Sequence, residues 1–299
     1  MKFFALATAA ASLLIANAAL AASLDEIPRV GGFVVGAQAW TFNKGTLFEA
    51  IDRTKAAGGN TLEVYLMGMK VSAETGEVLF DENLSDEHIA AVKKKCEGAG
   101  VRIINAYIGS KAWTRIGTDE NALRRFFEFG KKLGVQGFTG EPAEPQWDMV
   151  EKLVREFNMI FAVHNHIKGF EAPYIGGEYK YWDPRYTFER LKTRDERFGI
   201  CFDTGHAARS GLDVVAVLKA IAGRCHSVHL KDVVAVDPDG HDVPFGTGVV
   251  NVRGFLEELE RQKIRGHVAV EYEWFTPHLE QDVVKCFAFL RDWKGAAGK

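Results

Sequence analysis

The chain has few cysteines, no surplus of basic residues and no repetitive segment, and each absence argues against a class of protein. Its four Cys are widely spaced without a CxxC pair, and Cys201 and Cys225 fall in apolar runs, so we expect buried thiols rather than a disulfide framework. The formal net charge is −3, which indicates no basic surface for nucleic acid. No low-complexity linker or charge run divides the chain. The composition of the chain, 47% hydrophobic and 26% charged, is that of a globular protein.

The first residues have the anatomy of a secretory signal peptide rather than of a folded element. Lys2 precedes an almost entirely apolar run over residues 3–16, and a small-x-small triplet, Ala-Leu-Ala, ends at residue 21. The run is short for a membrane span, and no Cys stands near the cleavage site to carry a lipid anchor. We therefore predict a signal peptide over residues 1–21 and a mature chain over residues 22–299. The predicted location is periplasmic or secreted, with no membrane attachment after cleavage.

Apolar, β-rich runs alternate with segments of helical periodicity along the whole mature chain. The predicted strands cover residues 33–39, 60–65, 101–107, 136–140, 159–164, 198–203, 225–230 and 267–272. The predicted helices cover residues 45–57, 85–98, 119–133, 146–157, 184–194, 212–222, 252–263 and 277–293. Gly134, Gly223 and Gly266 stand where helix ends need a residue that tolerates positive φ.

Strict alternation of strands and helices predicts parallel strands that close into a (β/α)8 TIM barrel, an α/β fold with one domain over residues 22–299. The alternative is an open doubly wound sheet. However, the first strand is followed by TFNKG rather than by a phosphate-binding glycine fingerprint. The longest irregular segment, residues 168–183, follows the fifth strand, so we expect it to lie over the barrel mouth as a lid.

Acidic or imidazole side chains stand at the ends of four predicted strands: Glu141, Asp203, His229 and Glu271. Because the carboxyl ends of barrel strands meet at one mouth, we expect these side chains to converge on one divalent cation. Carboxylate and imidazole ligands suit Mn²⁺, Mg²⁺, Co²⁺ or Zn²⁺, and a carboxylate-rich set favours Mn²⁺ or Mg²⁺, with Mn²⁺ as our first choice. For Asp203 taken alone, a role as a helix N-cap is the alternative.

Three further polar side chains near these strand ends are candidate catalytic residues. His206 is a candidate for binding a substrate hydroxyl or transferring a proton, or else for supporting a neighbouring ligand. Lys231 is a candidate for polarising a carbonyl, or else forms an ion pair with Asp232 or Glu273. Glu63, at the end of the second strand, is a candidate hydroxyl binder or base, or else the buried partner of a basic group.

Three segments resemble motifs of the sugar isomerase/epimerase superfamily, the xylose-isomerase-like barrels. FDTGHAARSG resembles the superfamily's sixth-strand motif, which implies Asp203 as a metal ligand and His206 as a substrate contact. SVHLKDV resembles its seventh-strand motif and implies His229 as a ligand. PFGTGVVNVRGFLEELERQKIRGHVAVEYE resembles its eighth unit, in which Glu271 is the implied terminal ligand. The resemblance covers essentially the whole mature chain and is specific for the superfamily rather than for one reaction.

The fifth strand departs from the superfamily's pattern. Several epimerases of this group carry a Glu ligand at its end, where AVHNH places His164. Either His164 replaces the carboxylate, or Glu141 supplies it from the fourth strand. We take Glu141 as the ligand and keep His164 as the alternative. His166, which shares a strand face with His164, is then free to act as the base. A metal-bound carboxylate such as Glu141 or Glu271 is the alternative base.

Related apurinic-site endonucleases share this barrel, and the segment DGHDVPFGTG resembles their DxH loop. Their extra histidines on the second and third strands are replaced here by Glu63 and Asn105, so a three-metal nuclease site lacks ligands. The acidic net charge of −3 argues the same way, and we predict no nucleic-acid partner.

The resemblance implies a metal-dependent sugar isomerase or epimerase that removes a proton next to a carbonyl and forms an enediolate. Secretion favours a free sugar or sugar derivative over a sugar phosphate. The alternatives are a 3-keto-glycoside lyase or hydratase on the same metal site, and a non-catalytic periplasmic sugar-binding protein. Candidates for the apolar walls of the sugar site are Trp40, Tyr107, Tyr181, Trp182 and Trp274. The resemblance also allows a homo-oligomer.

Overall fold

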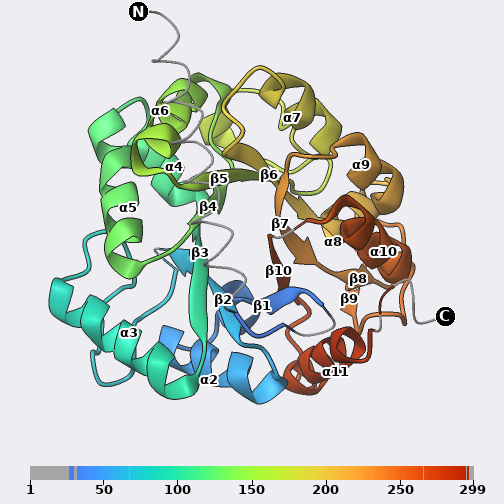
Figure 1. Ribbon diagram of the computed structural model, residues 1–299, viewed down its shortest axis with the longest axis horizontal. Helices are drawn as coiled ribbons and strands as arrows, with labels where there is room; N and C mark the ends of the chain where they lie inside the picture. Colours follow the sequence, from blue (N-terminus) through green and yellow to red (C-terminus); the bar gives the residue numbers. More distant parts are fainter. Residues whose placement is uncertain (1–26, 30–31, 67, 265, 294, 296–299) are drawn as a thin grey trace, which may run out of the picture.

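The computed structural model describes residues 27–29, 32–66, 68–264, 266–293 and 295, and its centre is a closed barrel of parallel strands (Figure 1). The strands follow one another around the barrel in the order β1-β10-β7-β6-β5-β4-β3-β2. Their bounds are β1 (Val34–Gln38), β2 (Thr61–Leu66), β3 (Arg102–Ile108), β4 (Gly137–Gly140), β5 (Ile160–His164), β6 (Phe198–Asp203), β7 (Cys225–Leu230) and β10 (His267–Val270). The predicted (β/α)8 barrel is confirmed.

An outer ring of helices surrounds the barrel (Figure 1). Its members are α2 (Leu47–Ala57), α3 (Asp86–Ala99), α5 (Glu120–Leu133), α6 (Trp147–Phe157), α7 (Pro184–Leu191), α9 (Val214–Ala220), α10 (Val252–Gln262) and α11 (Leu279–Arg291). Local signals set their ends: Thr46 and Glu49 form a capping box at the start of α2, and Gly134 ends α5 at φ 87°. All eight were predicted, with shifts only at their ends.

Several short elements were not predicted, and each follows the carboxyl end of a barrel strand. They are η1 (Ala39–Phe42), α4 (Ser110–Ile116), η2 (Glu144–Gln146), η3 (Pro173–Ile175), α8 (Thr204–Arg209) and the antiparallel pair β8 (Asp232–Val233) and β9 (Asp242–Val243). The alternation of strands and helices is therefore less strict than the sequence suggested. Segments this short carry no readable periodicity, so the sequence did not predict them. Because each follows the carboxyl end of a barrel strand, these elements lie around one mouth of the barrel.

An apolar layer joins the barrel to the helices, and it includes the fully buried rings of Phe127, Phe138 and Trp147. Glycine permits a close approach of β4 to β5. A Cβ atom at Gly137 would lie 2.2 Å from the backbone oxygen of Ile160, so β4 and β5 pair at this distance only without a side chain there.

All four cysteines, Cys96, Cys201, Cys225 and Cys286, are buried and free, as expected. Among the residues that the structure describes, no helix combines the length and the apolarity of a membrane span. The signal peptide predicted over residues 1–21 lies outside the described residues and stays a prediction.

Candidate metal centre and cavity

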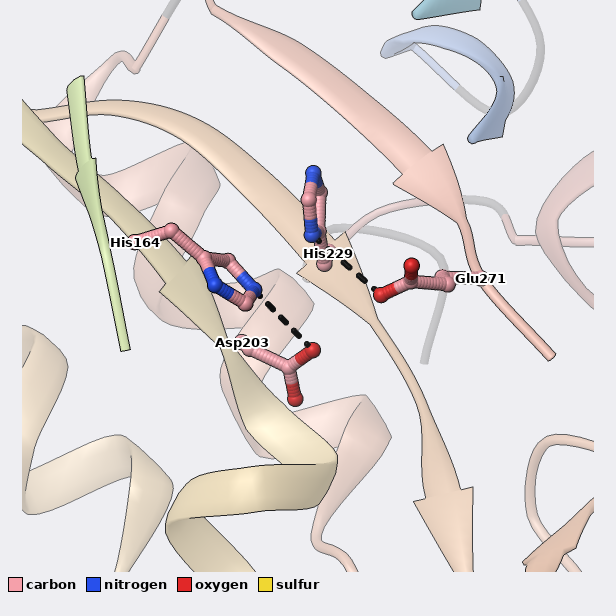
Figure 2. Close-up of side chains that lie close together, drawn as sticks. All are labelled: His164, Asp203, His229 and Glu271. Carbon is pink, nitrogen blue, oxygen red and sulfur yellow. Dashed lines mark ion pairs between the residues drawn. The ribbon is translucent and has the colours of Figure 1, made fainter. Parts of the chain in front are cut away.

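Four buried side chains meet at the carboxyl ends of four barrel strands (Figure 2). His164 ends β5, Asp203 ends β6, His229 lies one residue before the end of β7, and Glu271 directly follows β10. Each offers one ligand atom, and these atoms all lie within 4.8 Å of one another. We call these four residues the ligand cluster.

The atoms that face one another in the ligand cluster lack a well-aligned hydrogen bond. They are His164 Nε2, Asp203 Oδ2, His229 Nδ1 and Glu271 Oε2, and the Lys231 ammonium forms ion pairs with the two carboxylate oxygens. Buried polar atoms without a well-aligned hydrogen bond are rare and costly, so their convergence at one point indicates a ligand there. Two imidazole nitrogens and two carboxylate oxygens form a donor set that suits Mn²⁺, Co²⁺ or Zn²⁺. The residues present therefore fit a divalent cation.

Glu141, which the sequence suggested as a ligand, lies behind His164 rather than in the ligand cluster. Its Oε1 accepts a hydrogen bond from the Tyr107 hydroxyl and lies 2.7 Å from His164 Nδ1 and 3.2 Å from His166 Nε2. Burial alone raises the pKa of Glu141, but the neighbouring imidazoles hold it well below its usual range. Glu141, His164 and His166 form a second group with metal-ligand spacing. There, however, the ligand atoms already pair with one another.

The ammonium of Lys231 supplies positive charge beside the ligand cluster. Its Nζ lies 2.8 Å from Glu271 Oε2, 3.0 Å from Asp203 Oδ2 and 2.5 Å from Glu273 Oε2. Burial opposes the charge, but these carboxylates raise the pKa of Lys231 well above its ordinary value. The ammonium therefore serves as the counter-ion of these carboxylates. The suggested ion pair with Glu273 is present, whereas Asp232 accepts backbone N–H groups from the following loop instead.

Asp203 uses its two oxygens for different purposes. Its Oδ1 accepts a hydrogen bond of 2.7 Å from the backbone N–H of His206 and so caps α8, while Oδ2 faces the ligand cluster. The N-cap role and the ligand geometry therefore coexist. Burial lowers the pKa of His206 well below its ordinary value, so this imidazole is neutral. Its Nδ1 has no hydrogen-bond partner.

Two side chains connect the strand ends that carry the ligand cluster, and the sequence analysis missed both. Asn165 accepts a hydrogen bond of 2.9 Å from the N–H of Asp203 and donates one of 3.1 Å to its carbonyl. The Thr204 hydroxyl bonds the carbonyl and the N–H of Lys231, each at 2.8 Å. The only sequence signal for either residue is its position next to a predicted site residue. These bonds fix β5, β6 and β7 relative to one another.

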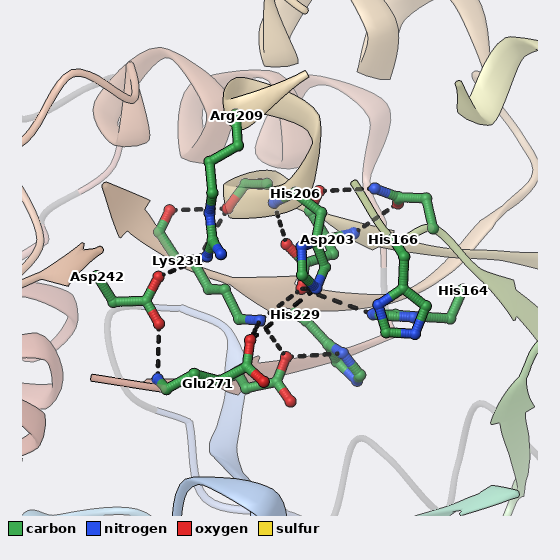
Figure 3. Close-up of polar contacts among 12 residues, drawn as sticks. His164, His166, Asp203, His206, Arg209, His229, Lys231, Asp242 and Glu271 are labelled. Carbon is green, nitrogen blue, oxygen red and sulfur yellow. Dashed lines mark hydrogen bonds and ion pairs between the residues drawn. The ribbon is translucent and has the colours of Figure 1, made fainter. Parts of the chain in front are cut away.

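Asp242 of β9 holds the segment that follows β10 (Figure 3). Its Oδ1 accepts a hydrogen bond of 2.8 Å from Arg209, and its Oδ2 accepts one of 2.6 Å from the backbone N–H of Glu273. Burial raises the pKa of Asp242 to about 6. The hairpin β8–β9 therefore keeps Glu273 beside Lys231.

The ligand cluster borders a cavity of about 240 Å³. The cavity is lined by Gln38, Trp40, Tyr65, Tyr107, Ser110, Glu141, His164, His166, Phe170, His206, Glu271 and Glu273. The rings of Trp40, Tyr65 and Tyr107 form one continuous wall, with centroids 4.6 Å and 5.4 Å apart. None of these lining residues is Lys or Arg, and three are Glu.

The predicted lid contributes another wall of the cavity. Phe170 stacks on His166 with ring centroids 3.9 Å apart. The buried Tyr179 hydroxyl accepts a hydrogen bond of 3.0 Å from the backbone N–H of His166 and donates one of 2.9 Å to the carbonyl of His164. Tyr181 anchors the same loop from within the core. The loop is therefore docked against the mouth.

The structure brings together eight of the nine predicted site residues at this mouth: Glu141, His164, His166, Asp203, His206, His229, Lys231 and Glu271. Glu63 lies outside the cavity lining, with its Oε1 2.6 Å from His229 Nε2. That geometry corresponds to the second role considered for it, the buried partner of a basic group.

Two of the five aromatic candidates line the cavity. Trp40 and Tyr107 line the cavity, whereas Tyr181, Trp182 and Trp274 are not among its lining residues. Tyr181 is buried in the core, and Trp274 is 47% exposed and stacks on His241. Missed by the sequence analysis, Tyr65 and Phe170 complete the walls. Aromatic residues near strand ends give no signal that separates cavity walls from core, since both surroundings are apolar.

The chain belongs to the family described as xylose isomerase-like TIM barrel, which matches residues 51–293. A solved structure of an uncharacterised protein from Parabacteroides distasonis is 29% identical, with a TM-score of 0.64 over 87% of this chain and 98% of that one. A D-tagatose 3-epimerase-like protein is 15% identical, with a TM-score of 0.66 over 87% and 97%. A 3-keto-D-glucoside 4-epimerase from E. coli is 16% identical, with a TM-score of 0.61 over 87% and 99%. A search of curated proteins finds no match.

Proposed function

We propose that this xylose isomerase-like barrel is a divalent-metal-dependent isomerase or epimerase of unphosphorylated sugars or sugar derivatives. The observation that carries the proposal is the convergence of two imidazole nitrogens and two carboxylate oxygens in the ligand cluster, beside an aromatic-walled cavity. The 3-keto-D-glucoside 4-epimerase and the D-tagatose 3-epimerase-like protein that share the fold support the reaction class. The signal peptide predicted over residues 1–21 supports a periplasmic or secreted location, which N-terminal sequencing of the mature protein tests.

We assign the cation to the ligand cluster, with His164 in the position first given to Glu141. The reason is that Glu141 Oε1 already accepts hydrogen bonds, whereas His164 Nε2 has no partner. Mn²⁺ is our first choice, and Co²⁺ and Zn²⁺ suit the same donors. When bound, such an ion acidifies the C–H next to a carbonyl and stabilises the negative charge that develops.

His166 is the proposed base. Its side chain lines the cavity, is 21% exposed and has its Nε2 3.2 Å from Glu141 Oε1. The carboxylate orients the ring and stabilises the imidazolium that forms when the ring takes a proton from carbon. The neutral His206 also lines the cavity, and we assign it to a substrate hydroxyl. Lys231 is fully buried behind the ligand carboxylates, so its proposed role is to hold them in place.

The chemistry of the cavity supports an uncharged substrate. Three carboxylates, Glu141, Glu271 and Glu273, face or border the cavity, and Lys231, the cation beside them, is already paired with carboxylates. No lining residue of the cavity is a Lys or Arg that could pair with a phosphate group, which favours an unphosphorylated substrate. The wall of Trp40 and Tyr65 offers an apolar surface to the C–H face of a sugar ring.

A second candidate is a lyase or hydratase that acts on a 3-keto-glycoside. The E. coli neighbour that acts on a 3-keto-D-glucoside favours this substrate class. The same proton abstraction next to the keto group leads to loss of a β-leaving group in place of reprotonation. A non-catalytic sugar-binding protein is the third candidate, and it has no use for the ligand cluster.

The deciding experiment combines metal content with proton exchange. Mn²⁺-loaded protein is incubated in D₂O with free sugars, sugar phosphates and 3-keto-glycosides, and deuterium uptake is followed by NMR. We expect uptake next to a carbonyl in unphosphorylated substrates, and its abolition by chelator. Asp203→Ala and Glu271→Ala should lose bound Mn²⁺ and exchange together. Stoichiometric metal in both variants contradicts the assignment of the ligand cluster. The enzyme proposal is contradicted if the protein binds no metal and exchanges no proton on any substrate. Elimination products would instead identify the lyase.

A further inference from the structure

The two imidazoles of the ligand cluster present opposite ring nitrogens to it. His164 directs Nε2 toward Asp203 Oδ2, at 3.5 Å, while His229 directs Nδ1 toward Glu271 Oε2, at 3.2 Å (Figure 2). A neutral imidazole carries its proton on one nitrogen and its lone pair on the other. For both lone pairs to face the same point, the two rings must adopt opposite tautomers. Something outside the ligand cluster has to select each of them.

A buried carboxylate stands behind each ring, at the nitrogen that faces away from the ligand cluster. Glu141 Oε1 lies 2.7 Å from His164 Nδ1, and Glu63 Oε1 lies 2.6 Å from His229 Nε2. The two carboxylates come from different strands of the barrel, Glu63 from within β2 and Glu141 from just after β4. Both side chains are almost completely buried, with exposures of 0% for Glu63 and 1% for Glu141.

His229 is the main partner of Glu63. Burial raises the pKa of the Glu63 carboxyl, while His229, and after it His267 and Thr139, lowers that pKa. The second oxygen of Glu63, Oε2, has no hydrogen-bond partner, and its one hydrogen-bonded ion pair is with His229. Burying an ionised carboxylate costs several kcal/mol unless it is well paired, and an apolar residue of similar size fills such a position at no such cost. The effect on His229 is therefore what the charge at this position provides.

We propose that Glu63 and Glu141 are paired positioning residues that select opposite tautomers of the two ligand imidazoles. Each carboxylate accepts the N–H of its own ring, so the opposite nitrogen faces the ligand cluster and is the one that would give its proton up to a bound cation. The consequence for metal binding rests on the proposed function, whereas the two hydrogen bonds stand independently of it. Glu141 also lines the cavity and contacts His166, so a change there alters the substrate site as well. Glu63 is not among the residues that line the cavity, which makes it the cleaner position to test.

The test uses the full-length mature protein with ¹⁵N-labelled histidine and Zn²⁺ as a diamagnetic probe. In the wild type we expect solvent-protected imidazole N–H signals from His229 Nε2 and His164 Nδ1, and zinc bound through the opposite nitrogens. Glu63→Leu should remove the His229 signal, keep the His164 signal and weaken zinc binding about 10- to 100-fold in a chelator competition. Glu63→Gln keeps an acceptor without the charge, so it should keep the N–H signal with a smaller loss of affinity.

Thr61→Val is the matched control, because Thr61 is a buried polar residue of the same strand that bonds His267 instead of a ligand. It should leave both N–H signals and zinc affinity as in the wild type. The inference is overturned if Glu63→Leu binds zinc within twofold of the wild-type affinity and His229 still binds through Nδ1. That outcome leaves the proposed metal site intact. Loss of the His229 signal in a protein that takes up no zinc supports the inference and overturns the proposed function. If Glu63→Leu does not fold, an unchanged zinc affinity in Glu63→Gln decides against a role for the charge.

Discussion

The ammonium of Lys231 lies 2.8 Å from Glu271 Oε2, one of the four atoms assigned to the cation. The same nitrogen lies 3.0 Å from Asp203 Oδ2, so one buried positive charge serves both ligand carboxylates. Without an ion, the positive charge of Lys231 offsets the cost of burying these carboxylates close together. With an ion, the lysine and the metal share the same counter-charges.

Lys231→Met should therefore destabilise the metal-free protein by about 3–5 kcal/mol, because it leaves buried carboxylates without their partner. Mn²⁺ should then stabilise the variant more than the wild type, since the ion replaces the missing charge. Denaturant unfolding with and without Mn²⁺ measures both effects. Lys94→Met, at an exposed position of α3, is the control and should behave as wild type. An identical response of variant and wild type to Mn²⁺ contradicts the shared-charge account.

The barrel itself could be predicted because parallel strands that are covered on both faces appear as continuous apolar runs. For β6 and β7 the predicted ranges coincide with the observed strands. The ends of these strands also place Asp203 and His229 correctly at the mouth, since the carboxyl ends of all barrel strands meet there.

The choice between Glu141 and His164 could not be made from the sequence. Both follow adjacent strands, and the ladder sets Gly140 opposite Val163, so the two candidates stand level with each other. Which one points at the ligand cluster depends on side-chain direction, which spacing along the chain does not give. The partnership of Glu63 with His229 was equally hidden, because it joins residues 166 positions apart across the barrel.

His267 should make stability depend on pH. Burial lowers the pKa of its imidazole from 6.5 to about 4, and its Nε2 lies 2.9 Å from the Thr61 hydroxyl. Between pH 4 and 6.5 the unfolded chain therefore binds more protons here than the folded one, so this contribution to stability falls as pH falls through that window. At 1.36 kcal/mol per pKa unit, the shift of the His267 pKa from 6.5 to about 4 makes this contribution to stability roughly 3 kcal/mol.

The measurement is the free energy of unfolding of wild type and His267→Gln from pH 7 to pH 4. The destabilisation caused by the substitution should shrink by up to roughly 3 kcal/mol over this range, because the wild type alone loses the contribution. His278→Gln, at an exposed position before α11, should follow the wild type throughout. A destabilisation by His267→Gln that stays constant with pH speaks against the buried neutral imidazole.

The docking of the lid can be tested with two tyrosines of the same loop. Tyr179→Phe removes the hydroxyl that bonds the backbone of His164 and His166, and it should cost about 1–3 kcal/mol of stability by leaving buried groups unpaired. The Tyr174 hydroxyl is buried without a hydrogen-bond partner, so Tyr174→Phe should be neutral or stabilising. Denaturant unfolding compares the two, and limited proteolysis should show faster cleavage within residues 168–183 in Tyr179→Phe alone. Equal effects of both substitutions argue that the hydroxyl bonds do not hold the lid.

The aromatic wall depends on two glycines that leave room for one ring. A Cβ atom at Gly109 would lie 2.7 Å from the Tyr65 hydroxyl oxygen, and one at Gly68 would lie 2.1 Å from Tyr65 Cε1. Because the ring is the movable partner in both contacts, Gly109→Ala should displace Tyr65 from its place beside Trp40 and disturb the surface offered to the sugar.

We expect Gly109→Ala to raise KM about tenfold or more, which corresponds to a loss of about 1.4 kcal/mol of binding, with a smaller change in kcat because the ligand cluster is untouched. Gly177→Ala, in the lid and with nothing within 4 Å of the added Cβ, is the matched control and should leave KM as in the wild type. Steady-state kinetics on the substrate identified by proton exchange measures both. An unchanged KM in a folded Gly109→Ala variant means that the ring does not contact the substrate, and the aromatic wall then belongs to the packing of the mouth rather than to recognition.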